Sequence, residues 1–317
     1  MNCVVCNNDI SLNDKIIVKE MMYGTKEEFE YYLCNYCNAL QIKTIPNNIS
    51  KYYENYYTQK KGYTTISNLR RILWNIRSNL ALSGFYPIIE FLSFNSILHW
   101  AKIAEINKNS RILDVGCGNG DVLFEFKKHG FKNLYGIDPN LADINLKDIK
   151  LHKNDIISYH TDEGFDLIMF NHSFEHIYEQ HKTLDRALNL LNDTGSIMIR
   201  IPIINKAFET YKEDWVQIDA PRHFVIHSIK SIKLLCEKNR LEIYNYFFDS
   251  TAFQFLGSEQ FKKGISSYAN RSYKTSINGS IFSEKDIKNY EKKAKYYNQN
   301  GLGDQAAFFI RKKYDEK

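Results

Sequence analysis

The chain of 317 residues contains no apolar run near the roughly 20 residues that a helix needs to cross a bilayer. Its first ten residues, MNCVVCNNDI, lack the basic region and the apolar core of a secretory signal. We therefore expect a cytoplasmic protein without a membrane span.

A strong excess of one charge is also absent. Lys and Arg number 42 against 37 Asp and Glu, which gives a net charge of +5. Such a mild excess is compatible with an anionic ligand and does not require nucleic acid as a partner. Because 44% of the residues are hydrophobic, the chain can bury a sizeable core, either as one large domain with an appendage or as two domains.

Cysteine is rare, yet four of the six cysteines form two C-x-x-C pairs: Cys3, Cys6, Cys34 and Cys37. In a reducing compartment this spacing favours a metal over a disulfide. Four thiolates complete tetrahedral Zn²⁺ and leave no open position, so the ion would be structural. We expect residues 1–45 to form a small zinc-ribbon-like module with a hairpin. The alternative is a set of unliganded core cysteines or a disulfide.

The rest of the chain divides by its hydrophobic pattern. Residues 46–108 are expected to be a linker and a helical segment that covers the active site. Their tyrosine-rich run 52–63 either closes over the substrate or forms a surface linker. From residue 109, short apolar runs alternate with amphipathic segments, which predicts an α/β domain over 109–317 with a parallel sheet. Insertions are expected at about 203–227 and 251–303.

Glycine is scarce as well, with 15 in the chain, but Gly116, Gly118 and Gly120 stand at alternate positions directly after an apolar run. Glycines at a strand-to-helix turn let the backbone approach a ligand closely. A dinucleotide dehydrogenase needs its third glycine where Asp121 stands. Asp114 before the loop suits a cationic ligand better than a pyrophosphate. S-adenosylmethionine carries an ammonium and a sulfonium and no phosphate.

Two further acids and one apolar residue follow the next predicted strands. Asp138 can accept hydrogen bonds from both ribose hydroxyls, or it caps a helix. Asp155 is placed to accept from the adenine amine, or it is a turn residue. Ile156 can pack on the adenine ring.

These motifs, LDVGCGNG, GID, ND and FDLIMFNHSFEHI, together resemble the class I S-adenosylmethionine-dependent methyltransferases. The resemblance covers about 109–248 with a last strand near 305–313. It implies a Rossmann-like seven-stranded sheet of order 3-2-1-4-5-7-6 with the last strand antiparallel. The expected cofactor-binding set is Asp114, Gly116, Cys117, Gly118, Asp138, Pro139, Asp155, Ile156, Asn171 and His172. Neighbouring glycines suffice to explain a small residue at Cys117, and Cys236 is interpreted as a core residue.

The zinc module and a second motif narrow the resemblance to bacterial methyltransferases of sugar, O-antigen and capsule biosynthesis. Those proteins carry a W…D-x-P-R-H…S pattern, matched here by Trp215, Asp219, Pro221, Arg222, His223 and Ser228. Deoxysugar C-methyltransferases share the zinc module and the pair Glu175-His176. They also carry a longer C-terminal domain, which we do not expect in this chain. For that reason we favour oxygen over carbon as the acceptor.

Methyl transfer to a hydroxyl requires a group that takes the proton, and histidine is suited to this. We expect His223 first and His176 second, with Glu175 beside them. A structural histidine is the alternative for each and is favoured for His227. Arg222 can bind a phosphate of a nucleotide-linked sugar, and Trp215 is expected to contact the substrate.

Other functions stay open. The basic stretch 285–295 keeps an RNA methyltransferase open as an alternative, although the mild net charge and the lack of an amine-methylating N-P-P-Y or D-P-P-Y signature count against it. A sugar C-methyltransferase and a non-catalytic cofactor-binding scaffold are further alternatives. The preferred partner is a nucleotide sugar or a glycan and not nucleic acid, and the oligomeric state stays open.

Overall fold

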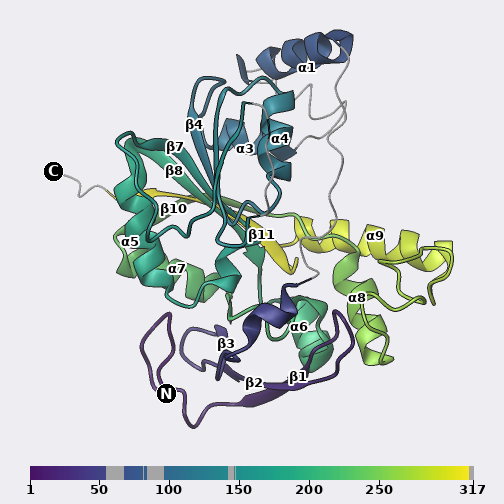
Figure 1. Ribbon diagram of the computed structural model, residues 1–317. Coiled ribbons are helices and arrows are strands. Elements are labelled where there is room, and N and C mark those ends of the chain that lie inside the picture. The colour runs from purple at the N-terminus through teal and green to yellow at the C-terminus, as the bar shows by residue number, and fades with distance from the viewer. Residues whose placement is uncertain (55–67, 81, 84–95, 142–145, 147, 314–317) are drawn as a thin grey trace.

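The computed structural model in Figure 1 describes residues 1–54, 68–80, 82–83, 96–141, 146 and 148–313. It contains two sheets: a large one formed by the α/β region, and a smaller one built mainly by the N-terminal segment. Within the described ranges no helix has the length and apolar character needed to cross a membrane.

The larger sheet has seven strands in the order β10-β11-β8-β7-β4-β5-β6. The neighbours β6, β5, β4, β7 and β8 run parallel, and β11 is antiparallel to both β8 and β10. This is the sheet order predicted from the sequence, with the last strand reversed, so the predicted fold class is confirmed. The strands are β4 (Arg111–Val115), β5 (Asn133–Ile137), β6 (Lys150–His152), β7 (Phe165–Asn171), β8 (Leu191–Pro202), β10 (Leu241–Phe248) and β11 (Gln305–Lys312).

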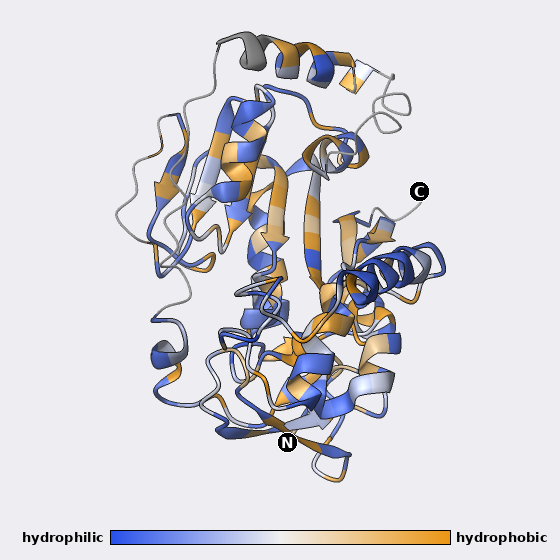
Figure 2. Ribbon diagram, turned by 90° about the vertical axis from the view of Figure 1, so that its right-hand side faces the viewer, coloured by the Kyte–Doolittle hydropathy of each residue, from blue (hydrophilic) through white to orange (hydrophobic). Residues whose placement is uncertain are grey.

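Helices cover both faces of this sheet. On one face, α5 (Gln180–Leu190) and α7 (Ile229–Lys238) contribute apolar side chains to a shared core with β7, β8 and β11. On the other face, α3 (Ser96–Ile103) and α4 (Asp121–Lys128) pack on the same strands. Figure 2 shows the apolar residues concentrated in the strands between these layers. Because both faces are covered, the central strands are continuous apolar runs, as in other parallel sheets.

The smaller sheet has the order β1-β2-β3-β9. Its first three strands, β1 (Lys15–Lys19), β2 (Glu28–Leu33) and β3 (Leu40–Ile42), come from the N-terminal segment. The fourth, β9 (Val225–Ile226), comes from far along the chain and pairs antiparallel with β3. The N-terminal segment is therefore joined by backbone hydrogen bonds to the stretch that carries His223.

Several shorter elements surround this junction. Residues 203–224 form α6 (Lys206–Tyr211) and the 3-10 turns η4 (Lys212–Asp214) and η5 (Val216–Ile218), while η1 (Ile49–Tyr52) and η3 (Phe174–His176) lie near the cavity described below. Residues 249–304 contain α8 (Phe253–Lys262) and α9 (Glu284–Gln299).

The region expected to cover the active site is described only in part. It contains η1, α1 (Asn68–Leu80) and α3. Most of the tyrosine-rich run, residues 55–63, lies outside the described residues, as do the predicted helical positions 84–95.

Candidate active site

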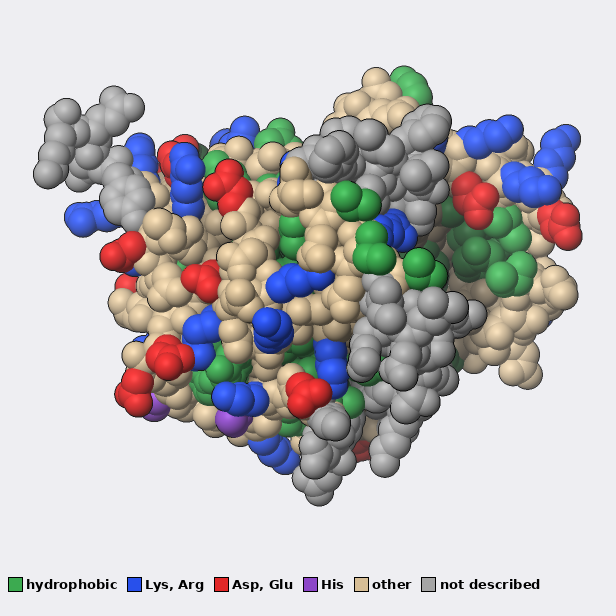
Figure 3. Space-filling model, turned by 90° about the horizontal axis from the view of Figure 1, so that it is seen from above, with side chains coloured by type: hydrophobic (Ala, Val, Ile, Leu, Met, Phe, Trp, Pro, Cys, Tyr) green, Lys and Arg blue, Asp and Glu red, His purple; other side chains and the backbone are tan. Residues whose placement is uncertain are grey.

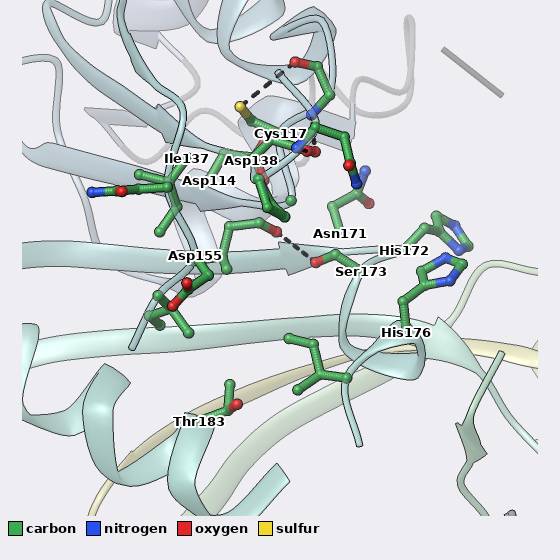
Figure 4. Close-up of a pocket in the computed structure, with 18 of the residues that line it drawn as sticks. Asp114, Cys117, Ile137, Asp138, Asp155, Asn171, His172, Ser173, His176 and Thr183 are labelled. Carbon is green, nitrogen blue, oxygen red and sulfur yellow. Dashed lines mark hydrogen bonds between the residues drawn. The ribbon is translucent and has the colours of Figure 1, made fainter. Parts of the chain in front are cut away.

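A cavity of about 750 Å³ opens at the carboxyl ends of β4, β5 and β7 (Figure 4). In open α/β sheets ligands bind at this edge. Residues of the glycine loop line one end, and Tyr53, His172, His176 and Phe224 line the other. We call these the cofactor end and the acceptor end.

The glycine loop follows β4 directly, and its geometry demands glycine. Gly116, Gly118 and Gly120 have φ angles of 74°, 51° and 79°. A Cβ on Gly116 would lie 2.5 Å from the Cβ of Ser173, a contact that no side chain tolerates. The loop therefore turns tightly against the end of β7 and leaves its backbone bordering the cavity.

Asp138 ties this loop to the end of β5. Its Oδ2 accepts the Gly118 N–H at 3.0 Å, and its Oδ1 accepts the Asn140 N–H at 2.7 Å. The side chain is 2% exposed and borders the cavity with Pro139. Each carboxylate oxygen has a second lone pair, so Asp138 can bind ribose hydroxyls while it holds the loop.

Asp114, at the fourth position of β4, has a carboxyl oxygen that the described residues do not satisfy. It is 2% exposed, and its Oδ1 has no hydrogen-bond partner among them. Burial raises the pKa of Asp114, and the negative charge of Asp138 raises it further, to about 8. A cation entering the cavity would stabilise the ionised carboxylate, as the sequence predicts for the ammonium group of S-adenosylmethionine.

The other predicted cofactor residues also border the cavity. Asp155 accepts the Ser158 N–H at 2.9 Å, which lowers the pKa of its carboxyl, and Ile156 is 3% exposed. Asn171 accepts a hydrogen bond from Arg200 at 3.1 Å. Cys117 is 8% exposed, and burial raises the pKa of its thiol. The structure brings all ten predicted cofactor residues to one cavity.

His172 bridges the two ends. Its φ of 54° is left-handed, and Arg200 Nη1 contacts its Nε2. Because a guanidinium only donates, Nε2 accepts and Nδ1 carries the proton. Nδ1 points to Oε1 of Glu175 at 3.5 Å, which is longer than a normal hydrogen bond.

At the acceptor end, the structure brings together the three residues predicted to be catalytic. Donor atoms of Glu175, His176 and His223 lie within 4.8 Å of one another. His176 borders the cavity, whereas Glu175 and His223 are 0% and 5% exposed. Burial lowers the pKa of His176 to about 4, with a further contribution from His223, so its imidazole is neutral at physiological pH. This placement favours His176 over His223 as the first contact with an acceptor, the reverse of the expected order.

Arg222 differs from expectation. It is 0% exposed, and its guanidinium contacts Asp219 through Nε at 3.0 Å and through Nη2 at 2.6 Å. Nη2 also donates to Glu20 at 3.0 Å. With these partners it does not reach a substrate phosphate. No pattern in the sequence indicates Glu20, which stands 202 positions away.

Trp215 also differs from expectation. It is 1% exposed, packs against Phe208 and donates from its indole nitrogen to Asp304 at 2.9 Å. These contacts make it part of the core around α6 and not of the cavity wall. His227, interpreted as structural, uses both ring nitrogens on Ser231 and Gln180.

Tyr53 and Phe224 border the acceptor end and were not among the predicted site residues. The Tyr53 hydroxyl lies 3.1 Å from Nδ1 of His176 and 3.3 Å from the carbonyl oxygen of Arg222. The tyrosine-rich composition around residue 53 was the available signal. Phe224 directly follows His223, but nothing in the sequence pattern distinguishes it from a core residue.

The four N-terminal cysteines form a compact cluster away from the cavity. Their sulfurs are mutually close, with Cys3 and Cys37 at 3.6 Å and Cys6 and Cys34 at 3.5 Å. Tetrahedral Zn²⁺ with bonds of about 2.3 Å holds its sulfurs about 3.8 Å apart, so the cluster fits the ion. All four side chains are buried, which leaves no route for a substrate.

Comparison with known proteins identifies the family of the region that forms most of the cavity. Residues 85–245 match a family described as a methyltransferase domain. EEF1A lysine methyltransferase 2 from Danio rerio is 33% identical over 96 residues, which cover 27% of this chain and 41% of that protein. A tRNA U34 carboxymethyltransferase from Campylobacter fetus is 25% identical over 170 residues, covering 49% of this chain and 57% of that protein. The chain thus spans about half or less of these relatives.

Two solved structures are also similar. A SAM-dependent methyltransferase from Archaeoglobus fulgidus is 19% identical, with a TM-score of 0.44 over 72% of this chain and 98% of that one. Coclaurine N-methyltransferase bound to N-methylheliamine and SAH is 13% identical, with a TM-score of 0.44 over 84% of this chain and 79% of that one.

Proposed function

Because the chain belongs to the S-adenosylmethionine-dependent methyltransferases, we propose that it transfers the methyl group to a hydroxyl of a nucleotide-linked sugar or surface glycan precursor. One observation carries this proposal: a single cavity joins the glycine loop to the cluster of Glu175, His176 and His223. A cavity of about 750 Å³ accommodates a cofactor and part of an acceptor.

S-adenosylmethionine would lie along the carboxyl ends of β4 and β5. Asp138 would accept from its ribose, Ile156 would pack on the adenine and Asp155 would accept from the adenine amine. Asp114 would face the ammonium group. In this arrangement the sulfonium methyl would face Asn171 and His172, between the cofactor end and the acceptor end.

The reaction is an in-line displacement in which positioning supplies most of the rate. The acceptor oxygen bonds to the methyl carbon as the carbon–sulfur bond breaks. The electron pair stays on sulfur, which becomes the neutral thioether of S-adenosylhomocysteine. The hydroxyl proton passes to Nε2 of His176, whose Nδ1 donates to the carbonyl oxygen of Arg222 at 2.8 Å. Glu175 beside it stabilises the imidazolium that forms.

We further propose that Cys3, Cys6, Cys34 and Cys37 hold a structural Zn²⁺. Four thiolates close the coordination sphere, so the ion supplies folding energy and no chemistry. Its effect reaches the acceptor end because β3 pairs with β9, Ser228 Oγ donates to the Cys37 carbonyl, and the Tyr31 hydroxyl donates to the His223 carbonyl at 2.9 Å.

The test is turnover of S-adenosylmethionine to S-adenosylhomocysteine by the full chain with a panel of nucleotide sugars. Total RNA and a protein extract serve as parallel acceptors. We expect product with at least one nucleotide sugar and a loss of about 10²–10⁴-fold in His176→Gln. Turnover with RNA or protein alone would overturn the sugar proposal.

Methylation of a protein lysine or of tRNA is the second candidate, because the relatives with those names match this chain. The matching segments of the lysine methyltransferases cover at most 27% of it. On the face seen in Figure 3, basic and acidic side chains are interspersed, without a single basic field of the kind that binds RNA.

A further inference from the structure

The cluster of Glu175, His176 and His223 combines two imidazoles and one carboxylate. Glu175 and His176 come from η3, and His223 precedes β9. Nε2 of His223 lies 3.9 Å from Oε1 of Glu175, and donor atoms of all three residues lie within 4.8 Å of one another. Ligand atoms around a tetrahedral ion with bonds of about 2.1 Å lie about 3.4 Å apart. Small side-chain movements would therefore bring the three donor atoms to the spacing that such an ion requires.

The carboxylate of Glu175 lacks the partners that a buried charge needs. The residue is 0% exposed, and neither Oε1 nor Oε2 accepts a hydrogen bond of normal length from a described residue, since Nδ1 of His172 comes only to 3.5 Å from Oε1. A buried acceptor without a partner costs about 1–3 kcal/mol, and more when it is charged. Native proteins rarely leave such a group without a ligand or an ion.

Both imidazoles are oriented as metal ligands are. Nδ1 of His176 donates to the carbonyl oxygen of Arg222 at 2.8 Å, and Nδ1 of His223 donates to the carbonyl oxygen of Gln217 at 2.7 Å. A carbonyl only accepts, so in both rings Nδ1 carries the proton and Nε2 carries the lone pair. Metal-binding histidines usually fix their tautomer by such a hydrogen bond.

The local charge favours a dication. Next to the cluster, the guanidinium of Arg222 faces the carboxylates of Glu20 and Asp219, which leaves one negative charge in excess. Oδ2 of Asp219 lies 3.9 Å from Nε2 of His223. Glu175 adds a second negative charge. Buried charges of this kind persist when they are paired or coordinate a metal.

We propose that Glu175, His176 and His223 bind a divalent transition metal of the Zn²⁺ class. Two imidazoles and one carboxylate suit Zn²⁺, Co²⁺ or Fe²⁺, whereas Mg²⁺ and Ca²⁺ prefer oxygen ligands. Three protein ligands leave at least one coordination position open, as in catalytic zinc sites. Because His176 borders the cavity, an open position on that side would be within reach of an acceptor.

The open position would bind an oxygen of the acceptor, and in this respect alone the inference rests on the proposed function. Proton transfer to His176, as described above, applies to the site without a metal. With an ion bound, the imidazole nitrogens would be ligands, and the hydroxyl proton would pass to water. The acceptor class is then one with an oxygen that can bind a metal, such as a sugar hydroxyl.

Zinc counting tests the proposal without any cofactor or acceptor. The untagged full chain is saturated with ZnCl₂, passed over a desalting column and analysed for zinc per chain. We expect two equivalents in the wild type, one in the cysteine cluster and one here. Glu175→Gln and His223→Gln should each retain one equivalent and bind the second zinc more than about 100-fold more weakly. His160→Gln, which alters an exposed histidine outside the cluster, should retain two.

One equivalent in the wild type, or two in both variants, would overturn the proposal. If the variants fail to fold, Co²⁺ substitution of the wild-type chain decides the matter. Visible bands of a nitrogen- and oxygen-ligated Co²⁺ beside those of the thiolate site support the proposal, and a spectrum of thiolate bands alone overturns it. Failure of sugar methylation with a second zinc present would leave the metal site standing.

Discussion

The two ends of the cavity are built in different ways. The cofactor end is made of residues at the ends of β4, β5, β6 and β7 or shortly after them, so each lies beside the strand that positions it. The acceptor end is assembled from distant segments, since Tyr53 meets His176 across 123 positions and His176 meets Arg222 across 46. The first depends on the large sheet, and the second depends on how the N-terminal segment docks against residues 203–227.

Because the two ends are built differently, cofactor binding and the arrangement of the acceptor end should respond to different substitutions. A change at the cofactor end should weaken cofactor binding and leave the N-terminal sheet intact. A change in the N-terminal segment should disturb the acceptor end and leave cofactor binding nearly unchanged. Single substitutions should separate the two ends, with effects that decrease from the N-terminal cysteines to Tyr53.

Removal of Cys34, a proposed zinc ligand, should have the largest effect. Structural Zn²⁺ contributes about 10–16 kcal/mol to the folding of small zinc modules, so Cys34→Ser should unfold the N-terminal sheet. We expect zinc content to fall, amide protection in β1–β3 to be lost and turnover to drop more than about 100-fold. Binding of S-adenosylhomocysteine should change less than about threefold. Equal loss of cofactor binding would show that the two ends are not separable.

Loss of the Arg222 guanidinium should cost less. Arg222→Met leaves the fully buried Glu20 and the largely buried Asp219 without their guanidinium partner, which costs about 3–5 kcal/mol of unfolding free energy. The matched control is Arg311→Met, since Arg311 pairs with Glu242 at the surface with its side chain 56% exposed. Such a pair contributes under about 1 kcal/mol. Urea unfolding measures both, and equal losses would contradict the buried network.

Asp114→Asn should act through pH. The unfolded carboxyl loses its proton near pH 3.8, whereas the buried Asp114 has a pKa of about 8. The folded state binds the extra proton between these values, so Asp114 destabilises the fold increasingly as pH rises from 4 to 8. The Asn variant should therefore gain stability over wild type by up to roughly 1.4 kcal/mol per pH unit in that range.

Urea unfolding of both proteins at pH 5, 6, 7 and 8 measures that difference. Parallel stability curves would show that Asp114 is not held protonated. The same variant should bind S-adenosylmethionine more weakly, because the neutral amide cannot stabilise the ammonium. If Asp114→Asn is more stable than the wild type but binds S-adenosylmethionine more weakly, the strain at the cofactor end comes from Asp114.

Tyr53→Phe should have the smallest effect. It removes the hydroxyl that lies 3.1 Å from His176 and 3.3 Å from the Arg222 carbonyl. One hydrogen bond contributes about 0.5–1.5 kcal/mol, so turnover should fall about 3- to 10-fold. Cofactor affinity should not change. A larger loss of affinity than of turnover would assign Tyr53 to the cofactor end.

The same contrast explains what the sequence could predict. The sheet order, the glycine loop and the grouping of the ten predicted cofactor residues at one cavity follow from local patterns, because a strand end and its loop are adjacent in sequence. The hairpin and the proximity of the four cysteines were also predictable from the C-x-x-C spacing. Each of these depends on a short stretch of chain and on the general geometry of parallel sheets.

The acceptor end could not be derived in this way. The pairing of β9 with β3 and the contact between Arg222 and Glu20 join segments about 200 residues apart. When its contact with Glu20 is not known, Arg222 looks like a residue that binds a substrate phosphate. Whether His176 or His223 contacts the acceptor first depends on which ring faces the cavity. Only the tertiary structure decides this.

The most direct test of the two-ended cavity compares binding with turnover in a matched pair of variants. Calorimetric titration with S-adenosylhomocysteine and steady-state turnover with the best acceptor are measured for Asp138→Ala and His176→Gln. The account predicts that Asp138→Ala weakens binding by about 10- to 100-fold, as expected for lost hydrogen bonds to a charged group. It predicts that His176→Gln binds as the wild type does but turns over about 10²–10⁴-fold more slowly. Equal loss of cofactor affinity in the two variants would contradict it.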